Sequence, residues 1–581
     1  MNTRYLSDTA ASLFLVLAFG VSLGAPLAAQ NPIFVDVAPE TGLDFRHWNG
    51  MTGEYFFIEM TGQGGAFLDY DNDGDLDVFI VQGSKISDKP ALEEFKGGEL
   101  KDRLFRNDLD QGKGLKFTDV TDASGINSTG YGMGVSVGDI DNDGYVDIYV
   151  TNFGANQLWK NQGDGTFVEV GGPTGTADEL WSTSAAFFDY DADGFLDLYV
   201  TNYVEWSLER NPKCYATSSR RDYCGPSAFA GQPDRLFRNR GDGRFEDVTA
   251  RVLPGYEAGA SLGIVSADLN GDKRLDLYVA NDGEVNQLWL QQENGTFLEE
   301  ALFSGVAVNR TGSPEASMGI DAGDVDNDGD QDLVLAHLMG ETNTLYVNDG
   351  AGLFEDRSVE SNLGAPSISF TSFGAGFLDF DNDGWLDLLM VSGAVRILED
   401  LAIAGDPYPL DQTNQLFRNQ GAGIYEDVTE RAGKSFHIPE VSRGAAFGDV
   451  DNDGAVDILV ANNNGPARLL LNQADGNNAG GNAWVGLRLV DHGRDALGAV
   501  ATIQQGKSIL SRRARTDGSY CSANDPRVTF GLGASDAKTV TVEVTWPDGT
   551  EETFADVPVG TYTTLTRKKD GPKEKPKETE K

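Results

Sequence analysis

Oxygen-bearing side chains alternate along a nine-residue run that occurs seven times in the 581-residue chain. The first copy spans Asp69 to Asp77 and reads DYDNDGDLD. With the run numbered 1 to 9, positions 1, 5 and 9 are Asp in every copy, and position 3 is Asp in six copies and Asn270 in the fourth. A tight turn carrying this many acidic side chains has the chemistry of a site for a hard cation.

Calcium is the cation that this spacing favours. It takes six to eight oxygen ligands at roughly 2.3–2.6 Å, which side chains 1, 3, 5 and 9 and the backbone carbonyl of position 7 can supply. Gly at position 6 of six copies permits the sharp reversal of the chain. The predicted ligands, by copy, are Asp69, Asp71, Asp73, Asp75 and Asp77; Asp139, Asp141, Asp143, Tyr145 and Asp147; Asp189, Asp191, Asp193, Phe195 and Asp197; Asp268, Asn270, Asp272, Arg274 and Asp276; Asp324, Asp326, Asp328, Asp330 and Asp332; Asp379, Asp381, Asp383, Trp385 and Asp387; and Asp449, Asp451, Asp453, Ala455 and Asp457.

The fourth copy departs from the pattern. Its glycine, Gly271, stands at position 4, and Lys273 and Arg274 follow it, so that three carboxylates and two cations leave a formal charge of −1. We therefore expect six or seven calcium sites, of which the Asp268 loop is the weakest.

The acidic run could also be an ordinary turn or part of an EF-hand. Asp and Gly also favour ordinary turns without a metal, but clustered carboxylates repel one another unless a cation is present, and seven copies share the feature. An EF-hand needs Glu at position 12 and flanking helices, whereas Ile80 and Val150 stand there. The β-branched and aromatic runs after each loop instead predict strands.

These loops recur within a larger unit that predicts an all-β, seven-bladed β-propeller. A second landmark follows each loop, as in Asp102-Arg-Leu-Phe-Arg-Asn107, and alternates polar with apolar residues like a half-buried strand. A further segment such as Phe117-Thr-Asp-Val120 gives a fourth strand, which completes one blade. Because the seventh unit lacks its own fourth strand, we expect Phe34–Val37 to close the ring and remove the exposed edges.

The strand order predicts two unlike faces. All seven calcium loops join strands 1 and 2 and must lie on one face, while the insertions at about 83–100, 203–232 and 392–413 join strands 2 and 3 on the other. Loops on a rigid scaffold are where binding usually resides. His47, His337 and His437 are expected on this second face, either as scattered or internally bonded histidines, which is the favoured interpretation, or as a ligand or transition-metal site.

Charge and the N-terminus indicate an exported protein. The formal net charge of −46 argues against nucleic acid and anionic membrane surfaces as partners. Residues 1–29 resemble a secretory signal, with Arg4, an apolar run from Leu13 to Leu23 and small residues up to Ala29. No membrane span is expected after cleavage. The expected location is extracellular, or periplasmic in a Gram-negative bacterium.

Three cysteines are present. In an exported protein, Cys214 and Cys224 are expected to form a disulfide, with free buried thiols as the alternative, and Cys521 is left over.

The chain resembles a known family in two segments. Residues 33–475, through the acidic loop and the Leu-Phe-Arg-Asn strand, resemble VCBS/FG-GAP repeats, which are related to the calcium-binding blades of integrin α-chain propellers. Residues 482–567 resemble an ASPIC/UnbV domain, through Asp517-Gly-Ser-Tyr520, Arg527-Val-Thr-Phe-Gly-Leu-Gly533 and Trp546-Pro-Asp-Gly549. The pairing is similar to the cartilage acidic protein family and implies an extracellular calcium-binding protein. Residues 482–567 predict a small β domain, and residues 568–581 a disordered tail.

No catalytic residue is predicted. Gly134-Val-Ser-Val-Gly138 matches a nucleophile elbow in letters, but Ser136 falls on a predicted strand and not on a strand-to-helix turn. The expected function is an extracellular binding or adhesion module with structural Ca²⁺ and an unidentified protein or glycan ligand. The alternative is an extracellular or periplasmic enzyme that acts on glycan, with its site on the face opposite the calcium loops.

Overall fold

The computed structural model describes residues 31–109, 114–406, 408–473 and 481–568. The signal expected at 1–29 lies outside the described residues, as does nearly all of the expected tail. The described residues from Pro32 onward form one compact unit. Within the described ranges, no helix is long and apolar enough to cross a membrane.

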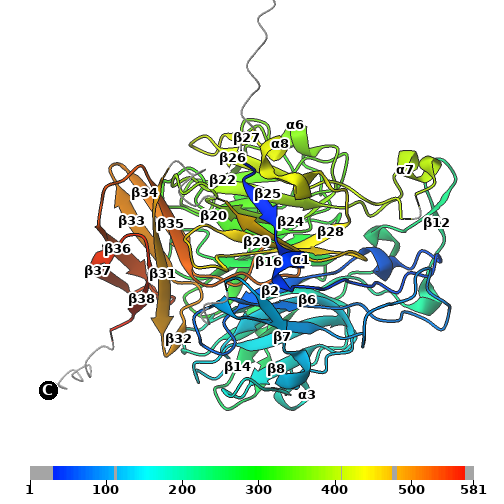
Figure 1. Cartoon of the computed structure of the whole chain (residues 1–581), viewed down its shortest axis with the longest axis horizontal. Coiled ribbons are helices and arrows are strands. Elements are labelled where there is room, and N and C mark those ends of the chain that lie inside the picture. The colour runs from blue at the N-terminus through cyan, green and yellow to red at the C-terminus, as the bar shows by residue number, and fades with distance from the viewer. Residues whose placement is uncertain (1–30, 110–113, 407, 474–480, 569–581) are drawn as a thin grey trace, which may run out of the picture. The chain divides into compact units, whose positions relative to one another are not determined.

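Seven four-stranded antiparallel sheets, six of them built from segments that follow one another in the chain, confirm the predicted propeller fold (Figure 1). Blades one to three consist of β2 (Gly65–Leu68), β3 (Asp77–Ile80), β4 (Arg103–Asn107) and β5 (Phe117–Asp119); β6 (Tyr131–Gly138), β7 (Asp147–Phe153), β8 (Gln157–Asn161) and β9 (Phe167–Glu169); and β10 (Ser182–Phe188), β11 (Asp197–Asn202), β14 (Arg235–Asn239) and β15 (Phe245–Asp247). Blades four to six consist of β16 (Ser261–Ala267), β17 (Asp276–Asn281), β18 (Gln287–Gln291) and β19 (Phe297–Glu299); β20 (Ile320–Gly323), β21 (Asp332–Leu335), β22 (Thr344–Asn348) and β23 (Phe354–Asp356); and β24 (Ser372–Leu378), β25 (Asp387–Ser392), β26 (Gln415–Asn419) and β27 (Tyr425–Asp427).

The seventh blade joins the two ends of the propeller. It contains β28 (Ser442–Gly448), β29 (Asp457–Asn462), β30 (Arg468–Asn472) and, as its fourth strand, β1 (Phe34–Asp36). Phe34 pairs with Asn472 and Asp36 with Leu470 in antiparallel register. The expected closure by the N-terminal strand is therefore confirmed, and β1 covers the edge of β30 that the C-terminal part of the ring would otherwise leave open.

Short helices follow the outer strands and end where the chain turns toward the next blade. They are α1 (Ala38–Thr41), α2 (Thr121–Ser124), α3 (Gly171–Thr174), α4 (Thr249–Val252), α5 (Ala301–Ser304), α6 (Gly364–Ser367) and α8 (Thr429–Ala432). Gly125 ends α2 in the left-handed region at φ 76°, and Gly42, Gly175 and Gly305 do the same after α1, α3 and α5. Glycine adopts this conformation at little cost, which explains why Gly stands at these four positions.

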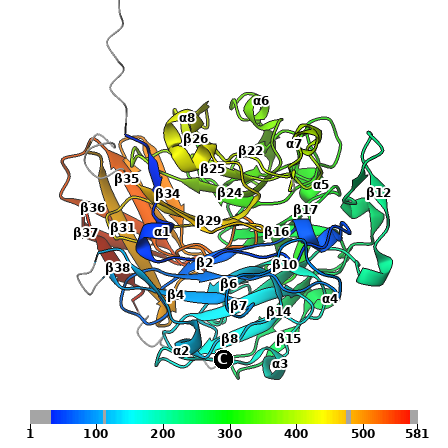
Figure 2. The ribbon, with the colours of Figure 1, turned by 45° about the vertical axis from the view of Figure 1, so that its right-hand side comes forward.

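The expected insertions lie between the second and third strands of blades one, three and six. Two of them carry secondary structure of their own: η3 (Leu208–Arg210), β12 (Cys214–Tyr215), β13 (Arg221–Asp222) and η4 (Pro226–Ala228) in blade three, and α7 (Glu399–Ala404) in blade six. Cys214 and Cys224 are joined by a disulfide, and Cys521 is free and buried. Figures 1 and 2 both place α7 and β12 on the side of the ring away from the C-terminal strands.

The C-terminal domain is built from two sheets around its own core, drawn orange to red in Figure 1. One contains β32 (Arg494–Asp495), β31 (Ala483–Asp491), β35 (Val528–Gly533) and β38 (Tyr562–Thr566), and the other β34 (Ser508–Arg513), β33 (Val500–Gln505), β36 (Thr539–Thr545) and β37 (Glu551–Pro558). β36 and β37 form the expected hairpin around Pro547–Gly549.

The inner strands of the propeller surround a filled centre. From one side, η1 (Phe57–Met60) inserts Phe57 and Met60 among Trp181, Tyr203 and Met318. From the C-terminal domain, residues 519–523 pair with inner strands: Ser519 N donates to Ile320 O at 2.6 Å, and Val135 N donates to Cys521 O at 3.1 Å. A Cβ on Gly64 would lie 1.5 Å from Cys521 O, so glycine is required for this close approach. The C-terminal domain is thus anchored in the propeller centre.

Candidate metal centres

Each acidic loop joins the first and second strands of its blade, so the seven loops share one face of the ring, as expected from the strand order. In at least five loops, carboxylate oxygens of positions 1, 3 and 9 lie within 4.8 Å of one another. These clusters are Asp69, Asp71 and Asp77; Asp139, Asp141 and Asp147; Asp189, Asp191 and Asp197; Asp324, Asp326 and Asp332; and Asp379, Asp381 and Asp387. Three converging carboxylates give the oxygen-only environment that Ca²⁺ prefers.

Position 9 is held in place by two backbone amides. In the first loop, Asp77 accepts the amide of Tyr70 at 3.1 Å on Oδ2 and the amide of Asn107 at 2.8 Å on Oδ1. Burial raises the pKa of Asp77 well above its ordinary value. The same two bonds are made in all seven loops, by the amide of position 2 and by the last residue of the third strand.

Position 1 is held by the turn itself. Asp379 accepts the amide of Asp383 at 3.0 Å on Oδ1 and the amide of Gly384 at 2.8 Å on Oδ2. Gly384 has φ 95°, which explains why Gly stands at position 6. Burial, together with repulsion from the neighbouring Asp383 and Asp381, raises the pKa of Asp379 to about 7 against the opposing effect of the Arg512 charge. A bound divalent cation would offset both the burial and the repulsion.

Position 3 supplies an oxygen that the protein leaves without a hydrogen-bond donor. Oδ1 of Asp191, Asp326, Asp381 and Asp451 is buried and accepts no hydrogen bond from the described residues. Because buried polar atoms nearly always have a partner, such an oxygen is suited to a metal ion. In the third loop, the other oxygen of Asp191 pairs with Arg238 from the third strand. These observations make the acidic loops a good fit for calcium.

Positions 5 and 7 are placed differently. The carboxylates at position 5 are not members of the five clusters. Asp143 Oδ1, for example, accepts the amide of Tyr145 at 3.0 Å, which shapes the turn, and Asp383 pairs with Arg418 at 2.8 Å. Ligation by position 5 and by the carbonyl of position 7 therefore stays a prediction.

In the fourth loop, two basic side chains of the loop form ion pairs with carboxylates. The Arg274 guanidinium pairs with the Asp272 carboxylate, and the Lys273 ammonium pairs with Glu551 of the C-terminal domain. Position 3 is Asn270, so one carboxylate fewer is available. The weak calcium affinity expected of this loop remains a prediction, and these ion pairs support it.

Asn at position 4 is a functional residue that the sequence analysis did not single out. Its side-chain amide donates to the carbonyl of position 6 in the next loop. The bonds are Asn327 to Gly384 at 3.3 Å, Asn382 to Gly454 at 3.2 Å, Asn452 to Gly74 at 3.4 Å, Asn72 to Gly144 at 2.8 Å and Asn142 to Gly194 at 2.9 Å. They link loops five, six, seven, one, two and three in order. The available signal was the recurrence of Asn in five copies, at positive φ that Asn tolerates.

The last residue of the third strand connects neighbouring blades. Asn419 Nδ2 donates to Val325 O of the fifth loop at 2.8 Å and to Leu386 O of its own loop at 3.1 Å. Equivalent contacts to the preceding loop are made by Asn107, Asn161, Asn239, Gln291, Asn348 and Asn472. The Leu-Phe-Arg-Asn landmark therefore ends in Asn because this amide holds two loops together.

The C-terminal domain lies against the loop face. Arg494 Nε donates to Asn142 Oδ1 at 2.8 Å, Arg512 Nη2 to Gly384 O at 3.2 Å, and Arg527 Nη1 to Asn452 Oδ1 at 2.7 Å. These are the groups that link the loops to one another. The face that carries the acidic loops is therefore also the face against which the C-terminal domain packs.

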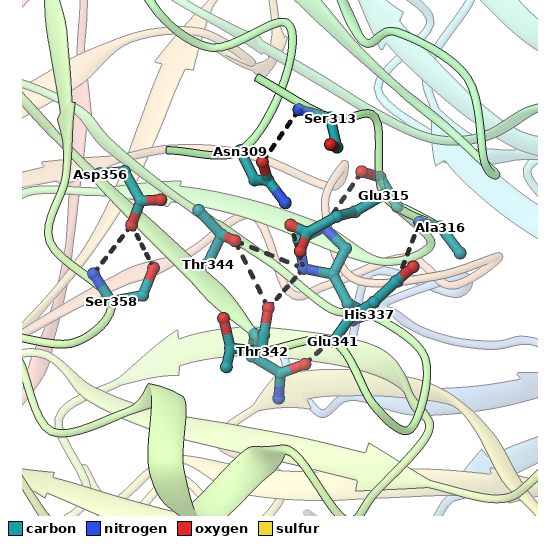
Figure 3. Close-up of polar contacts among 12 residues, drawn as sticks. Asn309, Ser313, Glu315, Ala316, His337, Glu341, Thr342, Thr344, Asp356 and Ser358 are labelled. Atoms are coloured by element: carbon teal, nitrogen blue, oxygen red, sulfur yellow. Dashed lines mark hydrogen bonds and ion pairs between the residues drawn. The ribbon is translucent and has the colours of Figure 1, made fainter. Parts of the chain in front are cut away.

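The three histidines of the other face form no common site. His47 and His337 are buried, with 1% and 2% exposure. The His47 ring accepts the Asn464 amide, and burial lowers its pKa to about 3. Figure 3 shows His337 between Thr342 and Glu315, with Nδ1 2.8 Å from Thr342 O. Among the described residues, no hydrogen bond or ion pair joins two of the three. His47 and His337 are internally bonded and His437 is exposed, which agrees with the favoured interpretation.

Ser136 lies within β6, paired opposite Tyr149, and is 1% exposed. The strand position expected from the sequence is confirmed, and the strand-to-helix turn of a nucleophile elbow is not formed here.

Comparisons with known proteins agree with this architecture. FG-GAP-like repeats match residues 69–150, 139–200, 227–279, 268–335, 324–390 and 398–460, which together are more than half of the chain, and the ASPIC and UnbV family matches residues 490–572. Cartilage acidic protein 1 of Mus musculus is 28% identical over 56% of this chain and 48% of its own length, so the chain spans about half of that relative. The Xenopus tropicalis protein is 25% identical over 74% of each chain.

Among solved structures, an Agrocybe aegerita lectin that recognises non-reducing terminal N-acetylglucosamine is 16% identical, with 63% of this chain and 79% of the lectin covered and a TM-score of 0.37.

The repeat motif, the blade topology and the C-terminal domain thus lead to one assignment. The chain belongs to the FG-GAP-like repeat family, carries a C-terminal ASPIC and UnbV domain, and is distantly related to cartilage acidic protein 1.

Proposed function

We propose that the protein is an exported calcium-binding propeller that acts as an extracellular binding or adhesion module, in which the ions are structural. The observation that carries the proposal is the buried position-3 oxygen without a donor, set within a carboxylate cluster of a loop that bonds to its neighbours. Calcium at such a site neutralises the cluster and fixes the turn. The linked loops then hold the blades and the C-terminal domain together.

The calcium concentrations at which extracellular modules work fit an exported protein. Extracellular calcium modules work at about 10⁻⁴–10⁻³ M, where free calcium is abundant. The disulfide between Cys214 and Cys224 is consistent with an oxidising compartment.

The ligand surface is proposed on the face formed by the insertions. Segments from different blades contact one another there: Ile397 N donates to Asp222 Oδ1 at 3.1 Å, and the rings of Tyr55 and Tyr223 lie 5.2 Å apart. An open cavity of about 460 Å³ is lined by Glu205, Glu209, Arg210, Asn211, Pro212, Ala228, Phe229 and Ala230. Charges of both signs beside an aromatic ring suit a polar ligand such as a glycan or a protein loop.

Calcium removal tests the structural role of the ions. One ion at ten times its dissociation constant contributes about 1.4 kcal/mol, so six or seven sites contribute on the order of 8–10 kcal/mol. We expect chelator to lower the melting temperature sharply and elemental analysis of the untreated protein to find calcium. An unchanged melt together with no calcium would refute the structural role.

A binding screen tests the ligand surface. The exported protein is applied, with calcium, to a glycan array and to immobilised extracellular matrix proteins. The double substitution Glu209→Ala and Arg210→Ala should abolish any binding found, while Arg431→Ala, an exposed cation on blade six, should leave it intact. Binding that survives the double substitution would place the ligand elsewhere.

A further inference from the structure

A small cavity of about 100 Å³ lies between the C-terminal domain and blades five to seven, on the loop face. Ser511, Arg512, Arg513, Arg515 and Arg527 line it from the C-terminal domain. The propeller contributes the position-1 carboxylates Asp379 and Asp449 of the sixth and seventh loops. Four arginines therefore surround one cavity far from the insertion face.

Several donors that line this cavity have no acceptor. Arg512 Nε, Arg513 Nε and Nη2, and Ser511 Oγ are buried and make no hydrogen bond with the described residues. The Arg513 side chain is 2% exposed, and Arg512 and Ser511 are 8% and 1% exposed. Leaving buried donors of a charged group unsatisfied is costly, so this arrangement calls for an acceptor in the cavity.

Arg512 is the arginine of this cavity without a carboxylate partner. Three of the arginines have one: Arg513 with Asp517 at 2.8 Å, Arg515 with Asp321 at 2.6 Å, and Arg527 with Asp525 at 2.9 Å. Arg512 has no ion pair within 4.0 Å among the described residues; it bonds two backbone carbonyls and lies 5.7 Å from the Phe530 ring centroid. The nearby Asp379 and Asp324 belong to calcium loops, and calcium bound there would offset part of their negative charge.

We propose that this cavity binds a small inorganic anion, held by the free donors of Arg512 and Arg513 and by the Ser511 hydroxyl. The small volume of the cavity and its single arginine without an ion pair favour a monovalent halide such as chloride. The anion joins the C-terminal domain to the propeller, because Arg512 also bonds Gly384 O of the sixth loop and Arg513 bonds Ser266 O of β16. Binding is strongest with calcium present, since calcium lowers the negative charge on the propeller side.

Crystallography with bromide tests the site without any substitution. Crystals of the calcium-loaded full-length protein are grown in bromide, and in a parallel arm in sulfate without halide. An anomalous bromide peak within hydrogen-bonding distance of Arg513 Nη2 and Arg512 Nε is the expected result. A sulfate at the same donors would keep the anion site but assign it to oxyanions. Water alone in both arms would overturn the proposal.

A solution measurement with matched variants tests the donors. The melting temperature of the calcium-loaded protein is followed as bromide replaces a large organic anion at constant ionic strength, and we expect it to rise. Ser511→Ala should raise the bromide concentration for half of this effect about tenfold, because one hydrogen bond to a charged partner is lost.

Arg512→Gln should abolish the effect. Arg494→Gln is the control, because Arg494 lies at the same interface and bonds Asn142, Gly194 and Asp495. It should lower stability and keep the bromide response. A response that is equal in wild type, Ser511→Ala and Arg512→Gln would refute the site, and Ser511→Ala keeps the test valid if Arg512→Gln does not fold.

Discussion

Replacing Asn419 tests whether the third-strand amide holds neighbouring blades together. The Asn419 side chain is 1% exposed and makes three hydrogen bonds: its Nδ2 donates to Val325 O at 2.8 Å and Leu386 O at 3.1 Å, and its Oδ1 accepts the Gly421 amide at 2.9 Å. Asn419→Ala removes all three at once. It also removes a direct bond between blade six and the fifth calcium loop.

The size of the loss follows from these contacts. A typical hydrogen bond contributes about 1 kcal/mol, which gives about 3 kcal/mol for the three. Leu386 O keeps a second donor, the Tyr425 hydroxyl at 3.2 Å, so we expect roughly 2–3 kcal/mol. Unfolding entropy is about 2.1 cal/mol/K per residue, or on the order of 1 kcal/mol/K for roughly 500 residues, so the melting temperature should fall by roughly 2–3 °C.

Differential scanning calorimetry with saturating calcium measures this shift. Gln420→Ala is the matched control, because Gln420 is the next residue, is exposed, and its side-chain amide donates to the surface carboxylate of Glu426. Asn419→Asp should cost at least as much as Asn419→Ala, since it keeps the acceptor for Gly421 but places a carboxylate against two carbonyls. If Asn419→Ala melts like Gln420→Ala, the amide does not connect the blades energetically.

Three further predictions concern other parts of the chain. Lys273→Gly, which restores glycine where Lys273 has φ 66°, should raise the calcium affinity of the fourth loop; equilibrium dialysis with elemental analysis measures it, and unchanged binding at low calcium would contradict this. Reduction of the Cys214–Cys224 disulfide, worth roughly 3 kcal/mol or less, should speed proteolysis within the blade-three insertion and leave the calcium-dependent melt unchanged, as limited digestion can show. Burial raises the pKa of Asp234 from 3.8 to about 7, so folding favours the protonated carboxyl and the contribution of Asp234 to stability falls as pH rises between these values. Asp234→Asn should make the melting temperature depend less steeply on pH across this range. An identical pH dependence in the variant would refute the assignment of this effect to Asp234.

The sequence was sufficient for the features that depend on near neighbours in the chain. Positions 1, 3 and 9 of a loop are brought together by a turn that bonds Asp379 to the amides of Asp383 and Gly384. Alternating polar and apolar residues predicted the third strands, and the repeat of Phe34–Val37 on the later outer strands predicted ring closure. Each of these depends on residue types within about one blade, so their spacing carries the information.

The tertiary structure alone decided how the repeats combine. Asn452 of the seventh loop bonds Gly74 of the first, and Arg494 bonds Asn142 of the second loop, 352 residues away in the sequence. The loop motif is the same whether or not another domain packs on it. No local pattern therefore shows that the C-terminal domain covers the loop face or that residues 519–523 enter the propeller centre. These contacts form because ring closure fixes the loops in one circle. Complementary charge and close packing at Gly64 and Cys521 then select the partner surface.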